Sequence, residues 1–330
     1  MKITSEFLNL QTDFGFKLLF GDERHKDILI RFLNALLGDK IHIKDVLFKN
    51  KEILPRGSDG KRIIYDVYCT SKIAEDRSVF LNGPSLEDGG TRHRDHHFIL
   101  EMQNLYTPPF EERMFYYASK MVSDQGKAGW NYDLEPVIAI AVTDFNFRNL
   151  SDKMVRDIML LDRDTSEVLT EKFHLFFVSL KEVPKVWEEC KTDLEEILFL
   201  LKNMDKMDNN SIAYKEGRYK DMFEAARINS LKEEEYIRYS DSLEKLRETQ
   251  AGIKYEAMMA SREARAKALA EGRAEGRAEG RAEGRAEGRE EGEKEEKVRT
   301  AKIMWNMGLN KETIRTVTRL SDEEIENILK

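Results

Sequence analysis

Two carboxylates stand inside apolar, strand-like runs of this sequence. Asp66 interrupts the run at residues 63–68, and Glu101 follows the apolar run at 97–100. An acidic side chain in such a run is costly to bury unless it is paired or binds a cation. Hydrolysis of a phosphodiester would account for that cost, because the reaction needs a divalent ion to hold the phosphate, activate water and stabilise the developing charge.

The residues beside Glu101 fit the same chemistry. Mg²⁺ prefers oxygen ligands and keeps several waters. Asp66 and Glu101 can supply two carboxylates, and the backbone carbonyl of Met102 can supply a third ligand. Gln103 lies on the same strand face as Glu101, where it can orient the attacking water. The alternative is a pair of ordinary acids at strand edges, because two carboxylates at this separation occur by chance in most chains.

The surrounding elements predict an α/β domain over residues 1–185. Apolar residues follow helical spacing at 14–37, with Gly21 as a break and Gly38 as a C-cap. Strand-like runs interleaved with helices follow, which predicts a mixed central sheet flanked by helices. We expect strands at 43–48, 63–70, 98–102, 136–142 and 173–180, and a further helix at 111–123.

A polar, glycine-containing stretch at residues 72–96 lies between two of these strands. Connections of this length without secondary structure are uncommon and are either functional or disordered. Three histidines lie in this stretch or at its end, namely His93, His96 and His97. A metal site and a solvated loop are the two interpretations.

Composition limits the class of protein. The chain has 330 residues, of which 41% are hydrophobic, enough for one large domain plus an appendage. Its net charge of −8 argues against a uniformly basic surface but allows a local basic face. The two cysteines have neither disulfide-scaffold nor zinc-site spacing, so we expect a reducing, cytoplasmic location. The sequence contains no apolar run long enough for a signal peptide or a membrane span.

Several segments, in this order, resemble one known family. They include the opening runs at 12–21 and 28–38, residues 65–67, the run at 98–103, and the late runs at 136–142 and 177–185. The predicted helix adds Arg113, Tyr117, Lys120 and Gln125. Together they are similar to the recombination-promoting nuclease or putative transposase family of the PD-(D/E)XK nuclease superfamily, over about residues 8–185.

The resemblance implies a Mg²⁺-dependent DNA endonuclease with a restriction-endonuclease-like core, linked to recombination or mobile DNA. It makes Asp66 and Glu101 the metal ligands and puts Gln103 where the wider superfamily has lysine. Glutamine carries no charge, and a cation could come from elsewhere. Lys120 and Arg113 are the candidates, and Arg113 is also a candidate DNA contact. A catalytically degenerate DNA-binding or assembly scaffold and an RNA-acting nuclease are the alternatives.

Asp13 belongs to the run that opens the domain. It lies one helical turn before Lys17, so both side chains can face the same side. Two interpretations stay open, namely an additional acid near the metal and a helix N-terminal acid with an i,i+4 partner.

The C-terminal half is charged and helical in pattern at 186–269. Residues 270–293 begin with five tandem copies of Ala-Glu-Gly-Arg. Each glycine costs a helix about 1 kcal/mol relative to alanine. The repeat is therefore either a charge-balanced linker or a helix packed against a second copy, and the second interpretation favours a homodimer or higher oligomer.

Residues 297–330 predict three short helices. Gly308 ends the first, Asn310 caps the second, and Ser321 with Glu324 forms a capping box for the third. One basic stripe on the middle helix suits contacts to phosphate or guanine. Its members are Lys311, Arg315 and Arg319. The alternative is a helical unit used for packing or self-association.

Overall fold

The computed structural model describes residues 5–38, 41–53, 63–73, 95–126, 129, 131–147 and 151–329. The chain divides into two compact units, Met1–Gln250 and Ala251–Lys330, which are described separately below. Most of the predicted 72–96 loop, with His93, lies outside the described residues. Its two ends belong to strands, because β4 runs to Ile73 and β5 begins at His96.

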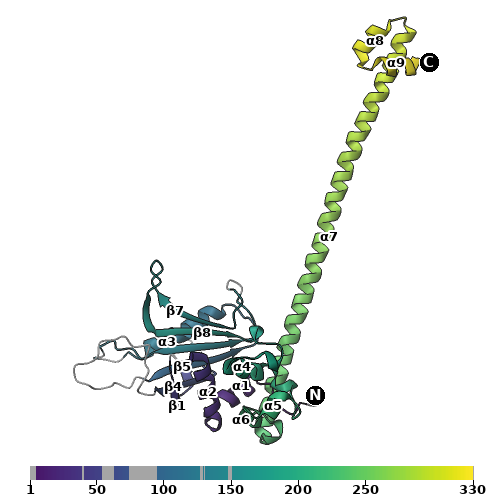
Figure 1. The fold of residues 1–330 in the computed structure, drawn as a ribbon. Helices are drawn as coiled ribbons and strands as arrows, with labels where there is room; N and C mark the ends of the chain where they lie inside the picture. Colours follow the sequence, from purple (N-terminus) through teal and green to yellow (C-terminus); the bar gives the residue numbers. More distant parts are fainter. Residues whose placement is uncertain are drawn as a thin grey trace. The chain divides into compact units, whose positions relative to one another are not determined.

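The first unit is built on a six-stranded sheet in the order β1-β4-β5-β6-β8-β7 (Figure 1). The strands are β1 (Ile43–Phe48), β4 (Val67–Ile73), β5 (His96–Gln103), β6 (Val137–Thr143), β7 (Val155–Leu161) and β8 (Val168–Ser179). Strands β5, β6 and β8 are parallel, whereas β1 with β4, β4 with β5, and β7 with β8 pair antiparallel. This mixed sheet with flanking helices confirms the predicted α/β fold class.

Helices cover both faces of the sheet. On one face, α1 (Asp13–Phe20), α2 (Lys26–Leu37) and α4 (Asp193–Asn203) share a core with strand residues such as Phe98 and Ile140. On the other face, α3 (Phe110–Asp124) packs on residues such as Ile99 and Ala139. Successive side chains of a strand point to opposite faces, so Glu101 lies on the α3 face together with Ile99.

The predicted strand at 63–70 is broken in two. Its first part, β3 (Ile63–Ile64), pairs with β2 (Glu52–Ile53), and β4 begins only at Val67. Between them, the Tyr65 N–H donates to the Lys51 carbonyl at 2.9 Å. The Asp66 N–H donates to a side chain, as described below. Because of this break, Asp66 lies outside the backbone pairing between strands β4 and β5.

Residues beyond 185 complete the first unit. The shared core includes Trp187, Ile197, Phe223 and Tyr239 alongside Phe16 from the opening helix. These residues belong to or adjoin α4, α5 (Ile212–Glu216), α6 (Lys220–Ala225) and the start of α7 (Glu233–Asn306). The boundary predicted at residue 185 thus does not separate two cores, and the first unit continues to residue 250.

The Ala-Glu-Gly-Arg repeat is helical, because residues 270–293 lie within α7. The structure thus has the repeat as helix, and its packing against a second copy stays a prediction. A Cβ built on its glycines, from Gly272 to Gly292, would meet nothing within 4 Å. The glycines therefore line an open surface of the helix rather than a close contact within the chain.

The second unit ends in two short helices, α8 (Lys311–Thr318) and α9 (Asp322–Leu329). The predicted caps are present, since Asn310 accepts from the Thr313 N–H, and Ser321 and Glu324 exchange side-chain-to-backbone bonds. A small core joins them to the end of α7, made of Ala301, Ile314, Leu320 and Ile325. Among the helices that the structure describes, none combines the length and apolar character that crossing a bilayer requires.

Candidate active site

The structure brings Asp66 and Glu101 together at the start of β4 and within β5. The Asp66 N–H donates to Glu101 Oε1 at 3.3 Å. In return, the Met102 N–H donates to Asp66 Oδ2 at 2.9 Å. Each carboxylate is thus oriented by a backbone N–H beside the other carboxylate.

Burial makes this pair electrostatically strained. Glu101 is only 9% exposed. Burial, followed by the charge of Asp66, raises the pKa of Glu101 well above its usual range. Burial also raises the pKa of Asp66, and the nearby Lys17 ammonium opposes that rise. A divalent cation would stabilise this desolvated pair, in which the charge of Asp66 disfavours the ionisation of Glu101.

Lys17 supplies a cation that the sequence did not assign to the site. Its Nζ lies 3.2 Å from Asp66 Oδ1 and 2.5 Å from Asp13 Oδ1. Burial lowers the pKa of Lys17, but the carboxylates of Asp66 and Asp13 outweigh it, and the pKa is raised. Asp13 therefore pairs with Lys17 at i,i+4 and, through it, adjoins Asp66. The only sequence signal for Lys17 was its spacing from Asp13.

Gln103 and Arg113 form one hydrogen-bonded unit beside Glu101. The Arg113 guanidinium donates to Gln103 Oε1 at 2.7 Å, and Gln103 Nε2 donates to the Leu105 carbonyl at 2.9 Å. The guanidinium also lies 5.0 Å from the ring centre of Phe110. Its positive charge lowers the pKa of Glu101, against the larger effects that raise it. Of the two cations named from sequence, Arg113 is the one found here.

Three other predicted residues lie further along α3. Lys120 pairs with Asp124, one turn away on the same helix. Tyr117 contacts the Tyr65 ring edge-on, and burial raises its pKa, with a further contribution from Glu101. Gln125 exchanges hydrogen bonds with the backbone of Glu135. Tyr117 and Gln125 thus make structural contacts, and the contact found for Lys120 is within its own helix.

The two described histidines of the predicted loop do not converge. His96 and His97 are neighbours in β5, so their side chains lie on opposite faces of the sheet. His97 bonds to the Tyr68 hydroxyl at 2.8 Å and to Glu135 at 2.6 Å. Within the described ranges there is no cluster of three or more His, Cys, Asp or Glu side chains that could hold a metal. A metal at Asp66 and Glu101 would therefore need backbone or water ligands.

The backbone beside Asp66 offers such a ligand. In an extended strand, the N–H and C=O of one residue point toward the same neighbouring strand. Because the Met102 N–H points at Asp66, its carbonyl is directed to the same side. Two carboxylates and one carbonyl are oxygen donors that suit Mg²⁺, which keeps waters on its other positions. The residues present therefore fit a Mg²⁺ ion.

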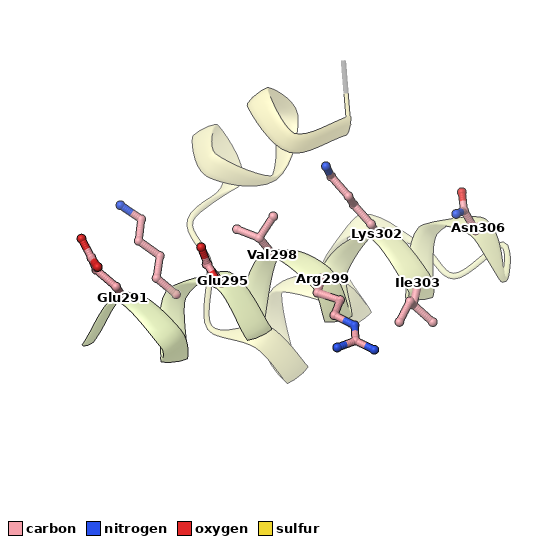
Figure 2. Close-up of a pocket in the computed structure, with 8 residues that line it drawn as sticks. Glu291, Glu295, Val298, Arg299, Lys302, Ile303 and Asn306 are labelled. Atoms are coloured by element: carbon pink, nitrogen blue, oxygen red, sulfur yellow. The ribbon is translucent and has the colours of Figure 1, made fainter. Parts of the chain in front are cut away.

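The predicted basic stripe of the second unit is largely paired. Lys311 lies 3.2 Å from Glu326, and Arg315 lies 3.1 Å from Asp322, so α9 neutralises both. Arg319 is the C-cap of α8 in the left-handed region, with φ 57°. A depression of about 680 Å³ in this unit is lined by the last turns of α7 and includes none of the three (Figure 2). Its lining residues are Glu291, Lys294, Glu295, Val298, Arg299, Lys302, Ile303 and Asn306.

A mixed sheet with two reciprocally bonded carboxylates on neighbouring strands defines a nuclease-like core of the PD-(D/E)XK class. A family model described as "PD-(D/E)XK nuclease family transposase" matches residues 10–79 and 90–256. The chain therefore belongs to this family of nucleases and transposases. Comparisons with curated proteins and with solved structures gave no match.

Proposed function

We propose that the chain is a Mg²⁺-dependent DNA endonuclease acting in recombination or transposition, with its site at Asp66 and Glu101. The observation that carries this proposal is the buried carboxylate pair, in which burial raises both pKa values and the charge of Asp66 raises the pKa of Glu101 further. Folding retains this unfavourable arrangement on the α3 face of the sheet. Strongly perturbed carboxyl groups of this kind are typical of functional sites.

Asp66, Glu101 and the Met102 carbonyl would hold the ion. When bound, Mg²⁺ would supply charge for the phosphate oxygens and a more acidic bound water. The backbone N–H groups of Asp66 and Met102 keep the two carboxylates aligned. This chain thus supplies a preorganised ligand set before the ion arrives.

Lys17 is our candidate for the cation that replaces the missing lysine. Its Nζ lies 3.2 Å from Asp66 Oδ1, so its positive charge adjoins one of the two proposed metal ligands. Gln103 is then a positioning residue, because it holds the Arg113 guanidinium beside Glu101. This assignment differs from the water-orienting role expected for Gln103, whose amide oxygen and nitrogen each bond to protein.

We also propose that α7 brings two chains together, since cutting both strands of a duplex is easiest with two sites. The described part of α7 exposes several large apolar side chains, including Ile253, Met258 and Leu269. Sedimentation of the purified chain over a range of concentrations tests this. A chain that stays monomeric on DNA and still makes double-strand breaks would remove the dimer from the proposal.

The test of the nuclease is a plasmid-cleavage assay with Mg²⁺ and with chelator. We expect Asp66→Asn and Glu101→Gln each to reduce cleavage at least about a hundred-fold, because each removes one charged ligand of the ion. Glu112→Gln, an exposed acid on α3, is the matched control and should cut like the wild type. Cleavage that ignores both site substitutions would sink the assignment. Metal-independent binding without cleavage would favour the scaffold, and cleavage of RNA alone would favour an RNA-acting nuclease.

A further inference from the structure

Two cavities that share Asp13 in their lining adjoin residues of the candidate active site. One, of about 390 Å³, includes Lys17, whose ammonium contacts Asp66. The other, of about 450 Å³, includes Met102 and Gln103. Both are lined by Asp13 and by two residues of α7, namely Asp241 and Ser242. The first turns of α7 therefore line both cavities, and we call this part of the helix the wall.

The wall is one face of the helix. Its lining residues recur at the three- and four-residue spacing of a single helical face. They are Glu235, Arg238, Asp241, Ser242, Lys245, Leu246 and Thr249. Tyr239, on the buried side, accepts the Asn9 N–H at 2.9 Å, and Ser242 accepts the Phe14 N–H at 3.1 Å. These bonds fix the wall to α1, which carries Asp13 and Lys17.

Most charges in the first cavity are already paired. Asp13 pairs with Lys17, and Asp22 and Glu235 both pair with Arg24. Two cations in this cavity have no acidic partner among the described residues, and they are Lys51 and Arg238. The cation that lines the second cavity is Lys245, and it also has no acidic partner in the described part of the chain. Asp241 is the one carboxylate of the two cavities without an ion pair among the described residues, so positive charge is in excess there.

Two of the three cations are held in place. The Arg238 guanidinium lies 5.6 Å from the ring centre of Phe14. Lys51 is half-buried, and its backbone carbonyl accepts the Tyr65 N–H, one residue before Asp66. Burial, with the charge of Lys17, lowers the pKa of Lys51. An anion in the cavity would strongly stabilise the charged form of this partly desolvated ammonium, which lies near another cation.

We propose that this wall binds the DNA backbone, with phosphates contacting Lys51 and Arg238 in one cavity and Lys245 in the other. The inference rests on the proposed nuclease function and adds the path of the substrate strand. Arg238 and Lys245 are seven residues apart, about 10 Å along the helix. Phosphates of one strand of a duplex recur about every 3.4 Å along its axis, so the two side chains would bracket about three phosphate steps.

The test is a binding assay with a short labelled DNA duplex, made in the Glu101→Gln background so that cleavage does not interfere. Lys51→Met, Arg238→Met and Lys245→Met are compared with Lys254→Met, an exposed lysine on the opposite face of α7. We expect each wall substitution to weaken binding roughly ten-fold. Each should also lower the slope of log affinity against log salt by about 0.9, one phosphate contact. Lys245→Arg should keep both values.

Wall variants that bind with the same affinity and salt slope as Lys254→Met would overturn this inference, even if the wild type cuts DNA. If the wild type fails to cut but the slopes fall as expected, the binding wall stands and only the nuclease proposal fails. A fall that Lys254→Met shares equally would mean diffuse attraction rather than a track, and would also overturn it. Thermal unfolding of each variant shows that lost binding is not lost folding.

Discussion

Replacing Glu101 by glutamine should stabilise the metal-free protein. The substitution removes one charge from a buried pair and keeps an oxygen that can accept the Asp66 N–H. Burial and the Asp66 charge raise the pKa of Glu101, so the ionised form is less stable in the folded chain than in the unfolded chain. At neutral pH the ionised Glu101 therefore lowers the free energy of unfolding of the wild type, and the neutral glutamine of the variant does not.

The magnitude follows from the linkage between pKa and stability. Each unit by which folding raises the pKa costs about 1.4 kcal/mol once the group is ionised. Arg113 and the Asp66 N–H recover part of that cost. We therefore expect a gain of roughly 1–2 kcal/mol, inside the usual range for one substitution. For a unit of this size, 1 kcal/mol corresponds to roughly 2–4 °C in Tm.

The sign of the pH dependence is fixed by the same shift. An unfolded glutamate titrates near about pH 4.3, and folded Glu101 titrates higher. Below both values the group is neutral in both states and has no effect. As pH rises past about 4.3, ionisation stabilises the unfolded wild type before the folded one. The variant therefore becomes more stable than the wild type, and the difference in stability grows toward neutral pH.

Metal should reverse the order. An ion at about one hundred times its Kd stabilises the folded wild type by about 2.7 kcal/mol. Melting curves between about pH 4 and pH 8, with chelator and with Mg²⁺, measure both effects, starting below the pH at which the unfolded glutamate ionises. Glu112→Gln is the control. A variant less stable than wild type in chelator, or one that responds to Mg²⁺ as the wild type does, would refute the reasoning.

Three further predictions concern other parts of the chain. Lys17→Gln should slow single-turnover cleavage about ten- to a hundred-fold, because the positive charge at Asp66 is lost, and Lys17→Arg should restore part of it; equal rates for both variants and wild type would remove Lys17 from the site. Tyr239→Phe should destabilise the first unit by about 1–3 kcal/mol in urea unfolding, because the Asn9 N–H loses its acceptor, and an unchanged midpoint would contradict this. Ile314→Ala should cost the small core of the second unit about 2–5 kcal/mol, seen as faster hydrogen exchange in α8 but not in β5 or β6; slowed or uniform exchange would argue against a separate core.

The sequence predicted the class of fold because its central strands are strongly patterned. The run around Ile140 is wholly buried, and the run before Glu101 is nearly so, which gives an unmistakable apolar signal. Strand β7 was not predicted because its side chains are mostly exposed or half-exposed. Residues 186–250 were not assigned to the first unit, because an amphipathic helix reveals that it packs but not which sheet face it covers.

The site was predictable where it follows from strand pairing and not where it depends on tertiary contacts. Asp66 and Glu101 come together because their strands are antiparallel neighbours. Lys17 reaches Asp66 from a helix far away in sequence, and helix spacing alone indicated only its partner Asp13. Strand alternation puts Gln103 on the face of Glu101, but its contact with Arg113 depends on how α3 crosses the sheet.

The first turns of α7 contribute to the geometry of the candidate site. Lys17 lies on α1, and the first turns of α7 are bonded to the start of α1 through Ser242 and to Asn9 through Tyr239. The position of the cation at Asp66 therefore depends on a segment that follows the sheet in the chain. This accounts for a family match that continues to residue 256 rather than ending with β8. A truncation after β8 would therefore remove the support for Lys17 and the wall beside Asp13, together with the part of the shared core that follows residue 185.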